Sequence, residues 1–232
     1  MNQVPTAWKS QLVELAQQVD IPVGATQTVA SGALLATFDI QYESDSAFVA
    51  VDLIRLPDQS VDQFVGKFAV TAPYVPRYFS FREGPPILGM LKWLRESQGL
   101  IPDLILIDGH GIAHPLKMGV ATYVGILANV PAVGCAKDPL LQQPFELDEA
   151  QGSICPMWLE HEQVGIAFRS RAGVKPIFLS PGHRISLEST AELAHILNGP
   201  FRILPPIRRA DQLARQAARR EVSCDFISSE NA

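Results

Sequence analysis

Three acidic residues in this sequence lie where a folded chain can bring carboxylates together. Asp108 ends the apolar run 104–107 and leads into a glycine-rich turn. Asp39 lies near the end of a second apolar segment, residues 34–42, and Glu83 precedes a Gly-Pro-Pro sequence. Carboxylates that converge from separate elements suit Mg²⁺, which takes oxygen ligands and keeps waters that a substrate phosphate can replace. These residue types therefore point to phosphodiester chemistry.

Each acid taken alone has a simpler interpretation. Asp39 fits an ordinary aspartate at a strand end or turn, and Asp108 before glycine fits a turn in which the side chain hydrogen-bonds its own backbone. Glu83 fits a glutamate that stabilises the start of its own helix. The metal hypothesis therefore depends on whether the fold brings these residues together.

The length of 232 residues predicts one α/β domain, assigned to residues 1–222, followed by a frayed polar tail at 223–232. No apolar run approaches the roughly 18 residues of a membrane-spanning helix. The N-terminus lacks a basic segment followed by an apolar one. The three cysteines, Cys135, Cys155 and Cys224, form no CxxC pair. We therefore expect a cytoplasmic protein without a membrane anchor, a disulfide framework or a zinc knuckle.

The charge of the chain is unevenly distributed. The net charge is −5, yet residues 169–220 hold ten Lys or Arg against three Asp or Glu. A basic segment of this kind is compatible with contacts to nucleic-acid phosphates. The alternative is that the arginines near the C-terminus only solvate a helix; these are Arg208, Arg209, Arg215, Arg219 and Arg220.

Hydrophobic periodicity predicts the order of the elements. An amphipathic helix in the first twenty residues precedes strands at 33–42, 47–56, 63–71, 103–108 and 131–136, with helices from Gly84 and near 116–127. The order β-β-β-α-β-α-β predicts an α/β, ribonuclease H-like fold with a mixed five-stranded sheet flanked by helices. In that fold the first strand pairs with the fourth, so Asp39 and Asp108 are expected side by side.

Further strands and helices are predicted after this core. Residues 154–159 and 163–169 read as a hairpin, and 177–179 as a short strand. Ser186 is predicted to cap a helix that ends at the Asn-Gly-Pro sequence 198–200.

Several blocks of sequence then match a known family. The chain resembles endonuclease V, the deoxyinosine 3′-endonuclease, over roughly residues 5–220. The matching blocks are residues 39–42, 73–83, 108–115 and 180–184, with a weaker fifth at 134–137. The departures are small: Cys135 stands where valine is expected, and Asp138 stands where a second basic residue is common.

The resemblance assigns roles to the charged residues. It implies that Asp39 and Asp108 bind the metal directly, and that Glu83 binds it through water or orients the nucleophile. Lys137 is implied to contact phosphate. His183 is implied to lie near the scissile phosphate, where it would position a water or shuttle a proton, because its pKa lies near neutrality.

The segment Pro73-Tyr74-Val75-Pro76 suggests how a substrate is selected. A tyrosine between two prolines is a rigid aromatic group on a stiff loop. In the family this segment is a wedge that fills the space left when the deaminated base leaves the stack, and stacking on a base is worth about 1–3 kcal/mol. The alternative is a tyrosine that packs on the protein surface.

The displaced base is expected to enter a small pocket read partly through main-chain groups. Glycines let a backbone approach a ligand closely. The residues expected to form this pocket are Ser80, Gly109, Gly111, His114 and Gly119.

Taken together, the resemblance implies a Mg²⁺-dependent endonuclease, with Mn²⁺ as a substitute. It would act on deoxyinosine in DNA and cut the second phosphodiester bond 3′ to the lesion, leaving 3′-hydroxyl and 5′-phosphate ends in a DNA-repair reaction. The alternatives are an endoribonuclease for inosine in RNA, a ribonuclease H-like nuclease or resolvase with another specificity, and an inosine-binding protein without activity. A monomer without an obligate protein partner is expected.

Overall fold

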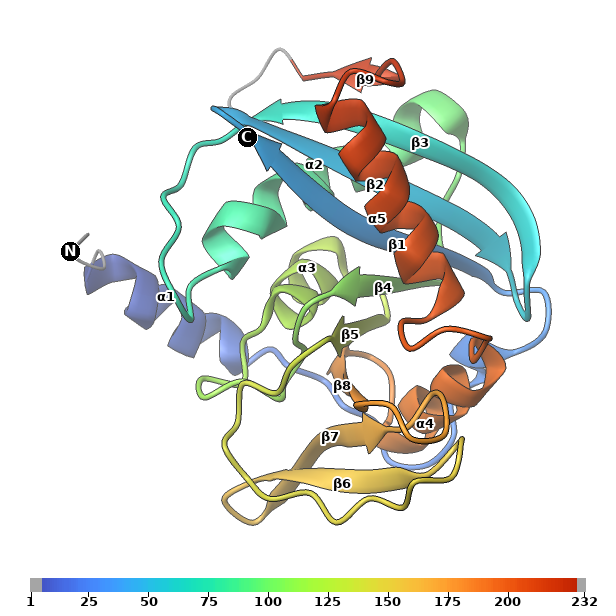
Figure 1. Cartoon of the computed structure of the whole chain (residues 1–232). Helices are drawn as coiled ribbons and strands as arrows, with labels where there is room; N and C mark the ends of the chain where they lie inside the picture. Colours follow the sequence, from blue (N-terminus) through green and yellow to red (C-terminus); the bar gives the residue numbers. More distant parts are fainter. Residues whose placement is uncertain (1–5, 229–232) are drawn as a thin grey trace.

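A long antiparallel meander forms one half of the sheet in the computed structural model, which describes residues 6–228 (Figure 1). It consists of β1 (Leu34–Glu43), β2 (Ser46–Arg55) and β3 (Gln59–Ala69). β2 is buried along almost its whole length because both of its faces are covered. Its sequence is accordingly rich in apolar and β-branched residues rather than alternating.

Two parallel strands follow on the other side of β1. β4 (Leu104–Asp108) pairs with β1 in a register that places Phe38 opposite Ile107, and β5 (Ala132–Ala136) pairs with β4. Asp39 and Asp108 are the next residues along their strands, so they lie at the same end of this pairing, where β4 ends and β1 continues beside β2 to Glu43. The predicted ribonuclease H-like core, with the first strand beside the fourth, is confirmed.

The C-terminal strands extend this sheet. Within the described residues the full order is β6-β7-β8-β5-β4-β1-β2-β3-β9. The predicted hairpin is present as β6 (Ile154–Leu159) and β7 (Glu162–Phe168). The next strand, β8 (Ile177–His183), is longer than the predicted 177–179, because its residues remain buried up to His183.

The C-terminal tail differs from the prediction. Residues 223–228 were expected to be frayed, but β9 (Phe226–Ile227) pairs in parallel with β3. Phe226 stacks on Trp93 with 5.8 Å between the ring centroids, which gives this short strand an apolar anchor. Residues 229–232 lie outside the described part of the chain.

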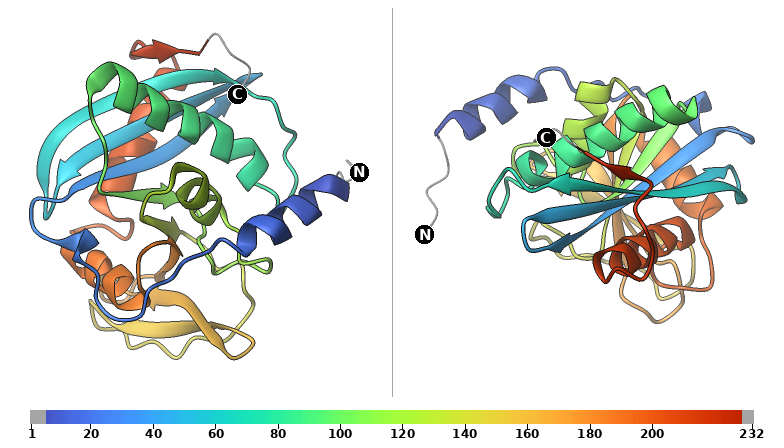
Figure 2. Two further views of the ribbon diagram at one scale, coloured as in Figure 1. Left: turned by 180° about the vertical axis from the view of Figure 1, so that it is seen from behind. Right: turned by 90° about the horizontal axis from the view of Figure 1, so that it is seen from above.

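Helices cover both faces of the sheet and give a three-layer structure (Figure 2). One face carries α2 (Ser80–Gln98) and α3 (Val120–Ala128), and the other carries α4 (Leu187–Ile196) and α5 (Pro205–Ala218). α1 (Thr6–Ala16) packs near the start of α2, and a 3₁₀ turn, η1 (Gln27–Val29), precedes β1. No helix among residues 6–228 combines the length and apolar character needed to cross a bilayer.

One helix begins where the sequence predicts, and two begin elsewhere. Ser186 caps α4 as predicted, accepting a hydrogen bond from the Ser189 amide at 3.0 Å. α2 begins at Ser80 rather than Gly84, so Pro85 and Pro86 lie inside it. A proline at position 86 leaves the Arg82 carbonyl without its usual helical donor. The Tyr42 hydroxyl donates to that carbonyl at 3.4 Å. α3 begins at Val120 and not near 116, because the preceding residues form turns.

Leu106 tests the assignment of the central core. Its side chain is fully buried on the face of the sheet covered by α4 and α5. Leu106→Ala should lower the free energy of unfolding by about 2–5 kcal/mol through lost burial and a residual cavity. Leu127→Ala, on an exposed part of α3, should change it by no more than about 0.5 kcal/mol. Urea unfolding of both variants is the measurement, and equal losses would contradict the assignment.

Candidate active site

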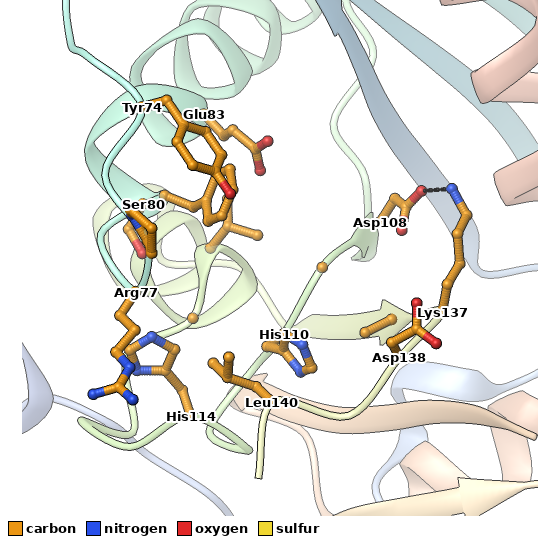
Figure 3. A pocket seen from close by; sticks show the side chains of 16 residues that line it. Tyr74, Arg77, Ser80, Glu83, Asp108, His110, His114, Lys137, Asp138 and Leu140 are labelled. Carbon is orange, nitrogen blue, oxygen red and sulfur yellow. Dashed lines mark hydrogen bonds and ion pairs between the residues drawn. The ribbon is translucent and has the colours of Figure 1, made fainter. Parts of the chain in front are cut away.

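Two aspartates and a lysine meet where β4 and β5 end beside the middle of β1. Lys137, just after β5, donates a hydrogen bond from Nζ to Asp108 Oδ2 at 2.6 Å (Figure 3). Burial, followed by the charges of Asp108 and Asp211, raises the pKa of Asp39 to about 8. Burial alone would lower the pKa of Lys137, but Asp108 with Asp39 and Asp211 raises it above its ordinary value. The site therefore holds more negative charge than its lysine offsets.

Asp211 is a site residue that the sequence interpretation missed. It lies on α5, which packs across β1 and β2, and its charge contributes to the raised pKa values of Asp39 and Lys137. Its Oδ1 also accepts a hydrogen bond from Arg215 Nε at 3.0 Å. Asp211 stands in an arginine-rich stretch, which suggested a solvated helix face. One feature of the sequence could have revealed it. The small residues Ala210, Ala214 and Ala217 let α5 lie close to the sheet.

Glu83 lies across the cavity from Asp108, in the first turn of α2 (Figure 3). Its place at a helix N-terminus was expected to favour the ionised form. Burial and then the charge of Asp108 act more strongly in the opposite direction and raise the pKa of Glu83 to about 8. The early start of α2 puts Glu83 inside the helix, so its side chain is held by regular backbone rather than by a loop.

The donor set of this site fits a divalent cation. Among the described residues, no three His, Cys, Asp or Glu side chains are gathered into a ready metal cluster. Mg²⁺ needs no such cage, because it binds through one or two carboxylates and fills its other positions with water and phosphate. Burial and then the neighbouring charges of Asp108 and Asp211 disfavour the ionised form of Asp39, and the Lys137 ammonium supplies part of the missing positive charge. A bound cation would offset the rest.

A cavity of about 470 Å³ opens beside these acids. Of the residues predicted for the base pocket, Ser80, Gly109, His114 and Gly119 line it. Gly111 does not line it. A Cβ at Gly111 would meet the Pro181 carbonyl oxygen at 2.2 Å, so this glycine is required where the turn packs against β8.

Two histidines in the cavity are neutral. Burial lowers the pKa of His110 to about 4, and burial together with His110 lowers the pKa of His114 to about 4. Nδ1 of His114 accepts a hydrogen bond from the Leu116 amide at 3.1 Å, which fixes the ring. The two imidazoles therefore add polar groups without charge, and the positive charge in this part of the lining comes from Arg77 beside His114 (Figure 3).

The predicted wedge is divided between the surface and the core. The Tyr74 side chain is 57% exposed and lines the cavity together with Pro76. Its ring packs edge-on against Phe79 with 4.7 Å between centroids. Val75 is buried and Pro73 is exposed away from the cavity lining, so these two residues support the loop rather than face the cavity.

The structure does not place His183 at the site. β8 runs antiparallel to β5, with His183 opposite Ala132, whereas Asp108 pairs with Cys135 further along β5. His183 therefore lies toward the opposite end of β5 from the acids. Its Nδ1 accepts a hydrogen bond from the Asp20 amide at 3.4 Å, and this contact ties the segment after α1 to the sheet. The matching sequence block reflects this packing role, and we exclude His183 from the catalytic set.

Several arginines of the basic C-terminal segment form ion pairs and hydrogen bonds within the protein. Arg209 is paired with Asp52, and Arg215 with Asp211. Arg169 and Arg202 donate hydrogen bonds to backbone carbonyls in the loop before β6 and in the loop before β8. The count of basic residues therefore overstates the positive charge available to a nucleic acid.

Comparisons with known proteins identify one family by sequence and by fold. A family model described as Endonuclease V matches residues 14–212. Endonuclease V of Roseiflexus castenholzii is 39% identical over 183 residues, which cover 78% of this chain and 81% of that protein. The crystal structure of Endonuclease V from Streptomyces avermitilis has a TM-score of 0.84 at 29% identity and covers 95% of each chain. Endonuclease V from Ciona intestinalis, in complex with a 24mer DNA containing an inosine followed by a ribo-adenosine, has a TM-score of 0.80 at 25% identity, covering 93% of this chain and 98% of that chain.

The raised pKa of Asp39 predicts how the stability of the metal-free protein changes with pH. Between pH 3.8 and about pH 8 the folded protein keeps a proton on Asp39 that the unfolded chain loses. The free energy of unfolding in EDTA should therefore fall as the pH rises from 5 to 8, by about 1.4 kcal/mol per pH unit while this difference lasts. Glu83 acts in the same direction.

Asp39→Asn should make the pH dependence of stability shallower, because the amide does not titrate. Asp45→Asn, in the exposed turn between β1 and β2, is the matched control and should leave the slope unchanged. Urea unfolding at pH 5, 6.5 and 8 measures both. A slope that Asp39→Asn leaves intact would show that this carboxyl is not the titrating group.

Proposed function

Because the chain belongs to the endonuclease V family, we propose that it is a divalent-metal-dependent endonuclease for deoxyinosine in DNA. The proposed reaction is hydrolysis of the second phosphodiester bond 3′ to the lesion, which leaves 3′-hydroxyl and 5′-phosphate ends. The observation that carries the proposal is a cavity lined by Tyr74, Glu83 and Asp108. Asp39 lies near enough to Asp108 and Asp211 for their charges to raise its pKa.

The acidic residues form the catalytic half of the proposed site. Asp39, Asp108 and Asp211 are the residues that would hold Mg²⁺, or Mn²⁺ in its place, and Glu83 would act through a water. Such an ion polarises a phosphoryl oxygen, lowers the pKa of water and offsets charge on the leaving oxygen. Lys137 already binds Asp108, so its ammonium is placed to contact a phosphate that approaches the same edge.

The cavity forms the recognition half. Tyr74 is exposed at its rim, and we assign it the role of filling the place of a base that has left the stack. Inside, Ser80, Gly109, His114 and Gly119 offer small polar surfaces to the base. The amides of Gly109 and Gly119 already donate to backbone carbonyls, so the backbone here would offer mainly carbonyl acceptors, which suit the ring N–H of a neutral purine.

Cleavage of an end-labelled duplex with a single deoxyinosine tests the proposed reaction. A nick one nucleotide beyond the lesion, formed with Mg²⁺ and not with EDTA, is the expected result. Faster cleavage of a matched RNA containing inosine would instead establish the endoribonuclease alternative. If a folded protein cuts neither strand, the proposed activity is wrong.

Variants of the acids test the metal assignment. Asp39→Ala and Asp108→Ala should each lower the cleavage rate on the order of a thousandfold or more, since a catalytic metal supplies several kcal/mol of transition-state stabilisation. Asp45→Ala, on the exposed β1–β2 turn, is the control and should cleave at the wild-type rate. Single-turnover rates on the deoxyinosine duplex are the measurement, and full activity in either site variant would refute the assignment.

Tyr74→Ala tests the wedge. Loss of stacking should weaken binding to the deoxyinosine duplex by about 1–3 kcal/mol, while binding to undamaged duplex changes little. Trp158→Ala removes a comparably exposed aromatic from β6, away from the cavity, and should have no effect on either duplex. Fluorescence anisotropy in EDTA measures the affinities. An equal loss on both duplexes would mean that Tyr74 does not read the lesion.

A further inference from the structure

An ion pair between a fully buried aspartate and a partly exposed arginine joins α5 to the sheet. Asp52, on β2, is 0% exposed. Arg209 Nε lies 3.0 Å from both carboxylate oxygens of Asp52, and its second nitrogen donates to Oδ2 at 2.7 Å. Gln63 Nε2 donates to Oδ1 at 2.6 Å. A carboxylate held by several charge-assisted hydrogen bonds fixes its partner in orientation as well as in distance.

Beyond Ile207 in its first turn, α5 meets the sheet mainly through small side chains. Ala214 and Ala217 pack against Phe48, Ala50 and Val65. Small side chains let the helix approach closely, but they interlock weakly with the strand surface and leave the helix free to turn about its own axis. A directional contact is therefore needed to fix that rotation.

Helix geometry connects this contact to the proposed active site. Arg209 and Asp211 are two residues apart, which places them about 200° apart around the helix. Ala210 lies between them and is fully buried. One flank of α5 thus carries Arg209 toward Asp52, and the other carries Asp211 toward Asp39 and Lys137. A rotation of the helix that loosened the first contact would displace Asp211.

We propose that Asp52 and Arg209 are positioning residues that set the rotation of α5 and so hold Asp211 in the metal site. The inference rests on the proposed function, because it takes Asp211 to be a metal-binding residue. It assigns a functional role to a pair that touches neither substrate nor metal. Outer residues that orient metal-binding groups typically change metal affinity 10–100-fold when they are altered.

The test is Mn²⁺ binding by the whole protein without DNA. The electron paramagnetic resonance signal of free Mn²⁺ measures this binding. Arg209→Lys keeps the positive charge beside Asp52 but loses the planar two-point contact. It should bind Mn²⁺ about 10-fold more weakly than the wild type. Arg208→Lys is the matched control on the next residue, whose guanidinium lies over Phe201, and it should bind as the wild type does.

A second variant separates positioning from stability. Asp52→Leu/Arg209→Met replaces the pair with apolar side chains, which buried ion pairs often tolerate without loss of stability. Its thermal unfolding midpoint should stay near that of the wild type, while Mn²⁺ affinity falls about 10-fold. Wild-type affinity in the double variant or in Arg209→Lys would overturn the inference, as would an equal loss in Arg208→Lys.

The same titration distinguishes failure of this inference from failure of the proposed function. Asp39→Ala and Asp211→Ala should each weaken Mn²⁺ binding strongly. If the wild type binds no Mn²⁺, or if Asp39→Ala binds it normally, the metal site itself is wrong and the inference falls with it. If Asp39→Ala and Asp211→Ala lose affinity but the Arg209 variants keep it, only the role of the pair is refuted.

Discussion

The parallel pairing of β1 with β4 is the constraint on which the rest of the site depends. Their register brings Asp39 and Asp108 to the same end of the pairing, where the two carboxylates lose hydration and repel each other. Within the described residues, the positive charge that compensates these two carboxylates is the Lys137 ammonium at the end of β5. The buried core around β4 supplies the stability that makes such an unfavourable charge arrangement tolerable. A loosely packed sheet would relax by separating the acids.

The two faces of the sheet contribute differently to the site. α2 brings Glu83 and the Tyr74 loop on one side, while α5 brings Asp211 on the other. Negative charge gathers at the strand ends, whereas the cavity behind them contains imidazoles that burial keeps neutral. A nucleic acid would thus meet a region for its phosphates and a separate region for a base. Under the proposed function, this division would let one small domain combine lesion recognition with hydrolysis.

The sequence predicted the elements with strong local signals, and it failed where long-range packing decides. Asp39 and Asp108 were predictable, because the strand order of a ribonuclease H-like sheet makes the first and fourth strands neighbours. Asp211 was not, since an acid among arginines resembles a solvated helix face until α5 is placed on the sheet. His183 was assigned from its motif, but the length and direction of β8 move it away from the acids. No local pattern encodes that distance. The pairing of β9 was equally hidden, because it depends on residues more than 150 positions earlier in the chain.

The position of β9 also has a bearing on how the protein behaves at high concentration. Gly66 and Lys67 of β3 pair with Phe226 and Ile227, and the Asp225 side chain accepts a hydrogen bond from the Val65 amide at 2.8 Å. Without them this stretch of β3 would present free backbone donors and acceptors, a template on which another molecule can add a strand. Residues 225–227 therefore protect this edge of β3 against aggregation. A shortened protein that ended after α5 would keep the proposed catalytic groups but leave this edge of β3 free to pair with another molecule.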